Sequence, residues 1–495
     1  MDISPHLNDF LAAARPGARF PVFAELPLAD HTPVGIYAAI RRDGHGFILE
    51  SGKLGRYSYV GAGASWIWRS SGRECRIIED GAAGSLDGDP FALLESALAG
   101  ETVIPNPHLE NFTGGLVGYL SYDMARHIER LPEHAAHDLD IPESCFMRAE
   151  SYYEIDHERR LLRVVTAPVL RDDVAMEEQY AAIVEVLRGM ASAIEASPAD
   201  PPAADAEPAD APVEANLSPG EFAAIVRRAK EYIAAGDIFQ ANLSVRFRQP
   251  LGVDPFRLYL ELREVNPSPY MAYIDLPELA IVSASPELLL KVHGGVIETR
   301  PIAGTRPRGK SRQEDIANAE ELIANEKERA EHLMLVDLER NDIGRVARYG
   351  SVEVDEFMAI EEYSHVIHIV SNVRGELAEG RSTFDAIRAC FPGGTITGAP
   401  KVRSMEIIEE LEPCRRGIYT GSIGWIGFDG DAELNIAIRT IVVKDAVAYA
   451  QAGAGIVADS VPELEYHESV RKAEAALEAI RRARAGRGAS GGSAA

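Results

Sequence analysis

The chain has 495 residues, of which 46% are hydrophobic and 26% are charged. This is the composition of a folded globular protein, and the length corresponds to about three domains of ~150 residues or to one large fold. The 50 Lys and Arg residues against 77 Asp and Glu residues give a formal net charge of −27. Because nucleic acids and anionic membranes attract basic surfaces, we expect neither as a partner.

The cysteines and the amino terminus favour a cytoplasmic protein. Cys75, Cys145, Cys390 and Cys414 lie far apart and form no CxxC pair, so we expect neither a disulfide scaffold nor a structural zinc site. Residues 1–20 lack a basic start followed by an apolar core, and no run of about 18 apolar residues occurs. We therefore expect no signal peptide, no membrane span and a cytoplasmic location.

The first half of the chain contains extended segments and ends in a break in composition. Residues 113–123 and 161–169 are expected to be extended. Residues 197–215 read SPADPPAADAEPADAPVEA, which has too little apolar surface for a core and predicts an acidic linker rich in Pro and Ala. The linker divides the chain into regions 1–196 and 216–483, and residues 484–495 are expected to form a disordered tail.

Helix signals and strand signals are mixed after the linker. Ser218 and Ser460 each open a capping box followed by apolar residues at helical spacing, which predicts helices that end near Gly236 and Ala483. A third helical pattern covers residues 314–338. The expected strands cover residues 270–276, 279–292, 421–428 and 434–443. There is no internal repeat, and the pattern predicts a mixed α/β fold.

Two pairs of glutamates are the first candidate site. Glu328 and Glu331 are three residues apart on one predicted helix, and Glu465 and Glu468 are three apart on another. Each pair therefore projects from one helix face, and Lys472 lies one turn beyond Glu468. Two such pairs facing each other would suit Mg²⁺, which prefers oxygen ligands. The spacing alone, however, is more typical of ordinary solvated helix faces than of a metal site.

Other polar residues are compatible with more than one role. In the predicted strand ELNIAIRTIVV, alternation places Arg439 opposite the apolar face, where it would need either a structural acid or a substrate carboxylate. Tyr419 lies just before a predicted strand, a position more typical of a core residue than of a ligand. The Gly-rich segments 391–401 and 451–460 could approach an anion or simply form tight turns. His365 and His368 lie among Val and Ile, where a histidine is commonly a core residue.

Taken together, these segments resemble the chorismate-utilising enzymes along nearly the whole chain. In region 216–483 the resemblance is carried by GDIFQANLS, NPSPYMAY, SASPELLL, ETRPIAGTRPRG, ERAEHLMLVDLERNDIGRV, YSHVIHIVS, FPGGTITGAPKVRSMEIIEELEP, RRGIYTGSIGW, LNIAIRT and AGAGIVADSVPELEYHES. In region 1–196 it is carried by ILESGKLGRYSYVG and FTGGLVGYLSYD. The resemblance implies one large α/β (α+β) fold of layered, mainly antiparallel sheets covered by helices, with a site for Mg²⁺ and chorismate in a central cleft.

The resemblance also assigns roles to individual residues. It implies that Glu331 and Glu468 bind Mg²⁺, with Glu328 and Glu465 beside them. The residues implied to bind the substrate are Tyr419, Arg439, Gly453, Gly455, Lys472, Gln240 and Ala303, and those implied to act in catalysis are His368, Glu287 and Thr397. Within this set, His368 would face the ring and the leaving hydroxyl, and Glu287 would be the general acid.

The choice of nucleophile separates the branches of the family. Relatives that add water carry a lysine base at the position of Gln240, so a glutamine there implies ammonia, supplied by a separate glutaminase subunit. The amination branches make anthranilate or 4-amino-4-deoxychorismate. Many members of the second branch carry a lysine nucleophile at the position of Ala303, so alanine favours anthranilate. The sequence around Glu339, however, resembles the second branch more closely. We therefore prefer 4-amino-4-deoxychorismate as the product. A small anion or water could replace the missing lysine.

A further group of residues matches the place where the family binds tryptophan, as an inhibitor in one branch and as a structural ligand in the other. These residues are Glu50, Ser51, Asn266, Pro267, Ser268, Tyr270 and Met271. The alternative is a sheet edge packed on a Pro-containing turn. Two other classes of function are a catalytically silent regulator that binds chorismate or tryptophan and an assembly subunit for a glutaminase. The intact set of implied site residues argues against the silent regulator.

Overall fold

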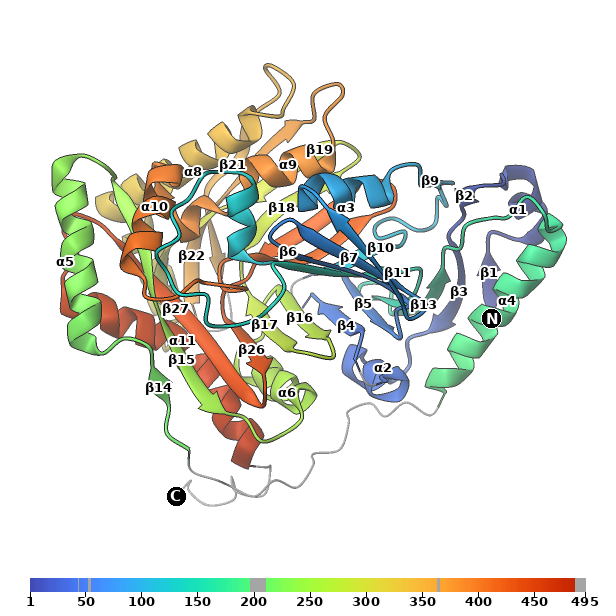
Figure 1. The fold of residues 1–495 in the computed structure, drawn as a ribbon, viewed down its shortest axis with the longest axis horizontal. Coiled ribbons are helices and arrows are strands. Elements are labelled where there is room, and N and C mark those ends of the chain that lie inside the picture. The colour runs from blue at the N-terminus through green and yellow to red at the C-terminus, as the bar shows by residue number, and fades with distance from the viewer. Residues whose placement is uncertain (43, 52–54, 196–210, 363–365, 486–495) are drawn as a thin grey trace.

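The computed structural model describes residues 1–42, 44–51, 55–195, 211–362 and 366–485. Most of the predicted linker, nearly all of the predicted tail and His365 therefore lie outside the described residues. The described part consists of two large antiparallel sheets with helices on their outer sides (Figure 1). The predicted α/β fold of layered, antiparallel sheets is confirmed.

The helices fall between and around the strands. They are α1 (Leu7–Ala13), α2 (Pro33–Ile40), α3 (Pro90–Leu98), α4 (Met176–Ile194), α5 (Pro219–Ala235), α6 (Pro255–Val265), α7 (Arg312–Ala324), α8 (Glu326–Gly344), α9 (Thr383–Cys390), α10 (Lys401–Leu411) and α11 (Pro462–Ala485), with the short 3-10 helices η1 (Tyr122–His127) and η2 (Gly394–Ile396). The capping box at Ser218 is present, and Gly236 ends α5 in a left-handed conformation. None of the described helices is both long and apolar enough to cross a membrane.

The first sheet contains 13 strands. Its order is β1 (Asp2–Ser4), β3 (Val22–Pro27), β13 (Leu161–Thr166), β12 (Ser151–Asp156), β5 (Tyr57–Ala62), β4 (Gly46–Glu50), β16 (Tyr270–Asp275), β17 (Ala280–Ser285), β26 (Thr440–Lys444), β27 (Val447–Ile456), β15 (Gln240–Pro250) and β14 (Glu214–Ala215), with β23 (Gly398–Ala399) also paired to β15. Composition places residues 214–215 in the linker, whereas the structure pairs them with β15 as the strand β14.

The second sheet contains 12 strands. Its order is β20 (Ile302–Pro307), β22 (Val366–Glu376), β19 (Val296–Arg300), β18 (Leu288–His293), β25 (Ala432–Ile436), β24 (Ser422–Gly427), β10 (Gly115–Leu120), β11 (Ser144–Ala149), β6 (Trp66–Ser71), β7 (Glu74–Glu79) and β8 (Ala82–Asp87), with β21 (Glu353–Glu362) paired to β22. The short strands β2 (Ala18–Arg19) and β9 (Thr102–Val103) form a separate parallel pair.

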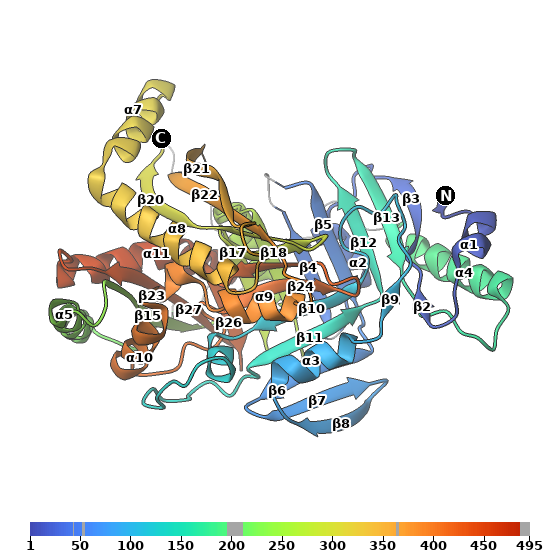
Figure 2. The ribbon, with the colours of Figure 1, turned by 90° about the horizontal axis from the view of Figure 1, so that it is seen from above.

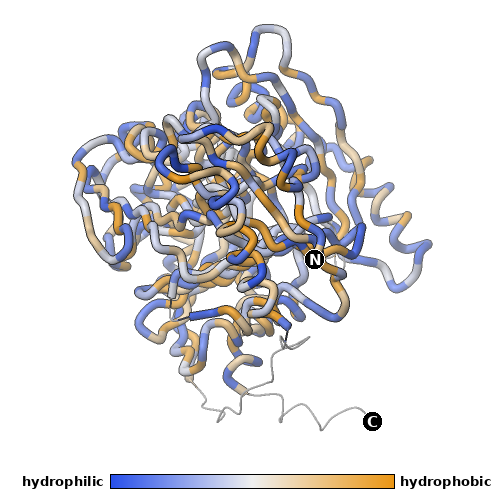
Figure 3. The backbone as a smooth tube through the Cα atoms, turned by 90° about the vertical axis from the view of Figure 1, so that its right-hand side faces the viewer, coloured by the Kyte–Doolittle hydropathy of each residue, from blue (hydrophilic) through white to orange (hydrophobic). Residues whose placement is uncertain are grey.

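The two sheets pack face to face and enclose one apolar core. Phe47 and Ile281 of the first sheet meet Val117 and Trp425 of the second in a single buried cluster, and the two sheets are seen together from above in Figure 2. Strands buried on both faces need apolar side chains on both, which explains runs such as GLVGYL in β10. Along the backbone, apolar and polar residues alternate over short distances (Figure 3), as expected for elements with one buried face.

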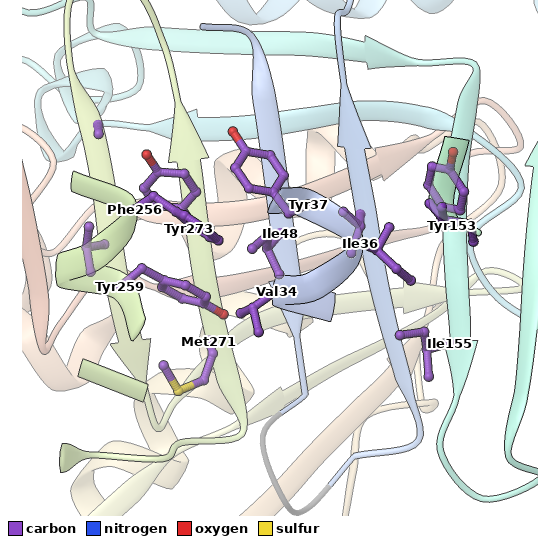
Figure 4. Close-up of a cluster of buried hydrophobic side chains, with 14 of the residues drawn as sticks. Val34, Ile36, Tyr37, Ile48, Tyr153, Ile155, Phe256, Tyr259, Met271 and Tyr273 are labelled. Atoms are coloured by element: carbon purple, nitrogen blue, oxygen red, sulfur yellow. The ribbon is translucent and has the colours of Figure 1, made fainter. Parts of the chain in front are cut away.

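Helices cover the outer face of each sheet. On the first sheet, α2 and α6 place Tyr37, Phe256 and Tyr259 against Tyr273 of β16 (Figure 4), and α4 and α11 extend the same cluster. On the second sheet, α3, α8 and α9 cover another cluster. Burial of these aromatic and aliphatic side chains is the main source of stability for the layered arrangement.

The regions on either side of the predicted linker share both sheets. In the first sheet β4 pairs with β16, and in the second β10 pairs with β24. Each of these pairs joins a strand from before residue 196 to one from after residue 216. Both regions therefore contribute strands to the interior of the same two sheets.

Three predicted elements are interrupted in the structure. The predicted helix 314–338 is two helices that meet at Asn325, whose side chain accepts a hydrogen bond from the Glu328 N–H and begins α8. The predicted strand 279–292 breaks after Ser285, and the predicted strand 434–443 breaks after Ile436. In both strands the chain leaves one sheet and enters the other, which a period-2 pattern does not reveal.

Candidate active site

The candidate active site lies where these two strands change sheets. The crossovers are hydrogen-bonded to each other, because the Ile436 N–H donates to the Glu287 carbonyl at 3.0 Å and the Ala284 N–H donates to the Arg439 carbonyl at 3.2 Å. Arg439 has a φ of 53°, so it does not continue the predicted strand alternation. The expectation that Arg439 lies within a regular strand is wrong, and the crossover instead places its backbone beside Ala284 at the end of β17.

Glu287 is a buried acid at the first crossover. Its side chain is nearly inaccessible, and Oε1 has no hydrogen-bond partner. Burial raises the pKa of Glu287 from 4.5 to about 7, although the Thr395 hydroxyl, the Ile302 N–H and the Lys472 charge act in the opposite direction. A carboxyl with this pKa carries its proton in a large fraction of molecules near neutral pH, as a general acid requires.

His368 lies on β22 with its ring held by the neighbouring strand β20. Nδ1 lies 3.2 Å from the Gly304 carbonyl and 3.0 Å from the Thr305 hydroxyl. Because a carbonyl can only accept, Nδ1 carries the hydrogen and Nε2 is the basic nitrogen. Burial, together with the nearby Arg439 charge, lowers the pKa of His368. The ring is therefore neutral near pH 7.

Arg439, Tyr419 and Lys472 supply the polar groups expected for binding an anion. Arg439 donates to the Lys472 carbonyl, and burial lowers the pKa of its guanidinium. Burial raises the pKa of Tyr419, so its phenol stays neutral and can donate. Lys472 Nζ lies 3.1 Å from the Gly453 carbonyl and 2.8 Å from Glu468 Oε1. A buried guanidinium favours the binding of a carboxylate.

β15 and β27 form the floor of the site. Gln240 Nε2 donates to Glu331 Oε1 at 3.3 Å, and a Cβ atom at Gly455 would come within 2.3 Å of that same nitrogen. A Cβ at Gly453 would likewise lie 2.5 Å from the Leu243 carbonyl. Close packing against the backbone therefore requires glycine at position 453, whereas a larger residue at position 455 would displace the Gln240 side chain.

Thr397 and Ala303 lie at two other borders of the site. Thr397 follows η2, is fully buried and donates its hydroxyl hydrogen to the Gly393 carbonyl at 2.9 Å. Its own carbonyl accepts from the Asn242 N–H at 2.9 Å, which ties the turn to β15. Ala303 is buried on β20 opposite Ile369. Its methyl group is chemically inert, so it can contribute shape but not a nucleophile.

The four predicted metal ligands lie at the beginnings of α8 and α11. Burial and the neighbouring Glu328 raise the pKa of Glu331, and burial and the neighbouring Glu468 raise the pKa of Glu465. The same two lysines, Lys327 and Lys472, act on both carboxyls, so the two helix starts face one another. Within the part of the chain that the structure describes, no three or more His, Cys, Asp or Glu side chains converge as metal ligands.

Two of these carboxylates are already paired with cations. Glu328 Oε1 accepts from Arg306 at 3.0 Å, and Glu468 binds Lys472. Glu331 and Glu465, by contrast, have raised pKa values because both are partly buried and each lies near another carboxylate. A divalent cation would offset that repulsion, and carboxylate oxygens are the ligands that Mg²⁺ prefers. The donor set therefore fits Mg²⁺ in its chemistry, with side-chain movement needed to bring the oxygens together.

The predicted tryptophan-like group comes together on the first sheet. Glu50 lies directly opposite Met271 on the paired strands β4 and β16. Ser51 follows β4, residues Asn266, Pro267 and Ser268 lie between α6 and β16, and Tyr270 begins β16. Glu50 accepts hydrogen bonds from Tyr259 at 3.0 Å and from Arg263 at 2.6 Å. The alternative interpretation as a sheet edge is wrong, because β4 and β16 are interior strands.

The sequence interpretation missed a buried ion pair beneath the site. Arg416 forms two hydrogen bonds to Glu412, at 2.8 and 2.9 Å, and donates to the carbonyls of Ile396 and Asn242. Its guanidinium carbon lies 5.6 Å from the centre of the Tyr419 ring. One side chain thus connects η2, β15 and the Tyr419 turn. The segment RRGIY was noted only as part of the resemblance, and no spacing rule marks Arg416.

Comparison with known proteins identifies the family. The sequence model of a family described as chorismate binding enzyme matches residues 47–478. The chain belongs to the chorismate-binding enzymes. It is 47% identical over 88% of its length to aminodeoxychorismate synthase component 1 of Bacillus subtilis, covering 92% of that protein. It is 46% identical over 98% of its length to anthranilate synthase component 1 of Thermus thermophilus, covering 99% of that protein.

Solved structures agree with this membership. The crystal structure of anthranilate synthase component I from Streptococcus pneumoniae matches with a TM-score of 0.74 and 33% identity, over 92% of this chain and 99% of that one. This chorismate-binding enzyme is accordingly a chorismate-utilising enzyme of one of two kinds, aminodeoxychorismate synthase or anthranilate synthase component I. The geometry above is thus that of an enzyme's candidate active site.

Proposed function

We propose that the enzyme replaces the C4 hydroxyl of chorismate with ammonia in a Mg²⁺-dependent reaction, giving 4-amino-4-deoxychorismate and water. The observation that carries the proposal is the combination of a buried acid at the first crossover and a glutamine at the start of β15. Glu287 is a buried acid with a pKa of about 7, and a glutamine, which cannot act as a base toward water, lies beside Glu331. Because no proton-accepting lysine stands at position 240, a nucleophile that is already basic is required, and ammonia meets this need.

Each residue has a defined task in this proposal. Arg439, Tyr419 and Lys472 bind the carboxylates of chorismate, and the neutral His368 presents its basic Nε2 to the hydroxyl side of the ring. Glu287 donates its proton as the C4–O bond breaks, so that the hydroxyl leaves as water. Mg²⁺, held by Glu331 and Glu468 with Glu328 and Glu465 beside them, would supply positive charge against a substrate carboxylate.

Two features support the aminodeoxychorismate product. One is the 47% identity to the Bacillus subtilis aminodeoxychorismate synthase component 1. The other is Glu339, which is buried and whose pKa rises to about 8 through burial and the neighbouring Asp342. The resemblance associates a glutamate at this position with that branch.

Anthranilate is the second candidate product. Ala303 supports it, as does the 46% identity to the Thermus thermophilus anthranilate synthase component 1 over 98% of the chain. In that reaction ammonia would add at C2, and pyruvate would be released. No side chain at position 303 can add covalently to the ring in either case.

We further propose a separate glutaminase subunit as the ammonia source and a cytoplasmic location. The four cysteines are buried and unpaired, and burial raises the pKa of each of their thiols. A glutaminase of the cysteine type needs a thiolate, which these environments disfavour. Unpaired cysteines are also typical of a reducing compartment.

The product of the purified chain tests the proposal. The chain is incubated with chorismate, Mg²⁺ and ammonium, and the products are separated by chromatography with fluorescence detection. We expect chorismate to be consumed without direct anthranilate formation, and 4-aminobenzoate to form only after addition of a separate lyase. Direct formation of anthranilate would establish the second candidate. Mg²⁺-dependent binding of chorismate without any turnover would favour the silent regulator. The absence of both binding and turnover would favour an assembly subunit.

A further inference from the structure

We infer that Glu339 is a positioning residue that acts through Glu287, by returning a proton to that acid after each turnover. This inference rests on the proposed function, in which Glu287 protonates the leaving hydroxyl. Glu339 lies on α8 and is 5% exposed. A buried carboxyl costs free energy unless its environment offsets the cost, so its place near the site needs a physical reason.

The proposed reaction consumes one proton at each turnover. Ammonia forms the C4–N bond with its lone pair and keeps its three hydrogens, so the product carries an ammonium group, the usual form of an amine near pH 7. The electron pair of the C4–O bond leaves with the hydroxyl, which becomes water by taking the proton of Glu287. Glu287 is then a carboxylate that must regain a proton. Because its side chain is only 5% exposed, we expect that proton to arrive through the protein.

The turn η2 lies against both acids. The Thr395 hydroxyl lies beside Glu287 and acts to lower its pKa. A Cβ atom at the preceding residue, Gly394, would lie 3.6 Å from Glu339 Oε1. The charge of Glu287 in turn acts to raise the pKa of Glu339. Two adjacent residues of one short turn therefore face the two carboxyls, which makes the acids neighbours.

The strand β19 supplies a second link between the acids. It pairs with β18, which begins directly after Glu287, and the hydroxyl of its residue Thr299 lies beside Glu339. Among the described residues, the hydroxyls of Thr299 and Thr395 and the Glu287 Oε1 atom are buried without a hydrogen-bond partner. A hydroxyl can both accept and donate, so these groups are suited to pass a proton from one carboxyl to the other.

On its other side Glu339 is connected to the surface by an ion pair. Asp342, which is buried three residues further along α8, accepts a hydrogen bond from Lys401 Nζ at 2.5 Å. The Lys401 side chain is 11% exposed, so this end of the series reaches solvent. The other titratable groups nearby are the exposed Arg345 and the buried Cys390 thiol. Lys401, Asp342 and Glu339 therefore form a series of proton-carrying groups that leads inward from the surface.

Glu339 holds a proton of its own near neutral pH. Lys401 is paired with Asp342, and in the part of the chain that the structure describes no Lys or Arg forms an ion pair with Glu339. Its pKa of about 8 lies slightly above the value of about 7 for Glu287. Glu339 is thus still protonated when Glu287 has lost its proton, and the small difference between the two pKa values allows transfer between them.

The test compares the first turnover with steady-state turnover, in saturating ammonium and Mg²⁺. With enzyme in excess over chorismate at pH 6, below the pKa of Glu287, each active site reacts once with the proton it already holds. Glu339→Gln keeps the volume but cannot carry the proton. We expect its first-turnover rate to stay within about twofold of the wild type and its steady-state kcat to fall by about 10- to 100-fold, part of what a general acid contributes. Glu154→Gln removes another buried carboxyl, on β12, whose pKa is also about 7, and is the matched control with both rates unchanged.

Two results would overturn this role. An unchanged kcat in Glu339→Gln would show that Glu287 regains its proton by another path. An equal fall of the first-turnover rate and of kcat would mean that Glu339 only supports the structure of the site. Glu339→Leu, which also carries no proton, should match Glu339→Gln; a normal Gln variant beside an impaired Leu variant would assign Glu339 a hydrogen bond instead. If the proposed function fails, the wild-type enzyme itself forms no amine product in either measurement.

Discussion

Replacing Glu287 with glutamine should change both the activity and the pH dependence of stability. The variant keeps the size of the side chain but cannot donate a proton. A general acid typically contributes about 10²- to 10⁴-fold to a rate, so we expect turnover to fall by that amount at pH 7. In the wild type the rate should also fall as the pH rises through about 7, because the acid form of Glu287 disappears.

The effect on stability can be worked out from the same pKa. A carboxyl whose pKa is raised from 4.5 to about 7 by burial holds its proton in the folded chain over a range where the unfolded chain has released it. The wild type therefore loses about 3 kcal/mol of stability between pH 4.5 and pH 7 relative to Glu287→Gln, which cannot ionise. Below pH 4.5 the free energies of unfolding of the wild type and Glu287→Gln should depend on pH in nearly the same way. Above pH 7 the difference between the two free energies should stay constant.

Urea unfolding at pH 5 and pH 8 measures this difference directly. The free energy of unfolding is compared between the wild type and Glu287→Gln at each pH, with Glu320→Gln at an exposed position of α7 as the control. We expect the variant to gain about 2–3 kcal/mol relative to the wild type between the two conditions. Parallel pH profiles for the wild type and Glu287→Gln would refute the buried, neutral state of Glu287 and with it the assignment as general acid.

Three other substitutions test the rest of the site. Glu331→Gln should abolish turnover, because it replaces a carboxylate of the proposed Mg²⁺ site with a neutral amide. Titration of the variant with Mg²⁺ should show weaker binding, and near-normal activity would contradict the metal assignment. Arg439→Lys should raise the KM for chorismate by about tenfold, because an ammonium group cannot form the paired hydrogen bonds of a guanidinium; an unchanged KM would make Arg439 structural. Arg416→Met should cost about 3–5 kcal/mol in urea unfolding by leaving the buried charge of Glu412 without a cation, and a cost below 1 kcal/mol would show that the ion pair is dispensable.

Local signals in the sequence predicted several elements well. Ser218, Pro219 and Glu221 form the expected cap of α5, because a capping box depends only on residues within one turn. The break at Asn325 was also readable, since Asn325 and Glu328 have the spacing of a helix start. The helical periodicity nevertheless continues on both sides of Asn325, so that pattern predicts one helix where the structure has two.

Long-range features could not be read from periodicity. The strand alternation around Arg439 is regular in the sequence, yet the chain changes sheets there. Arg439 has a positive φ, and its carbonyl accepts from the Ala284 N–H of the other crossover, which is distant in the sequence. The four glutamates and Lys472 could be grouped from helix spacing and the family resemblance. Arg416 could not, because its importance comes from the distant backbone carbonyls to which it donates.

The most direct test of the central claim is to follow the nitrogen. The purified enzyme is given chorismate, Mg²⁺ and ¹⁵N-labelled ammonium, and the product is analysed by mass spectrometry before any other enzyme is added. The proposal predicts a labelled product that has gained one nitrogen and still retains the enolpyruvyl side chain of chorismate, as 4-amino-4-deoxychorismate does. Labelled anthranilate with released pyruvate would contradict the proposed product, and a chorismate isomer without the label would contradict amination itself.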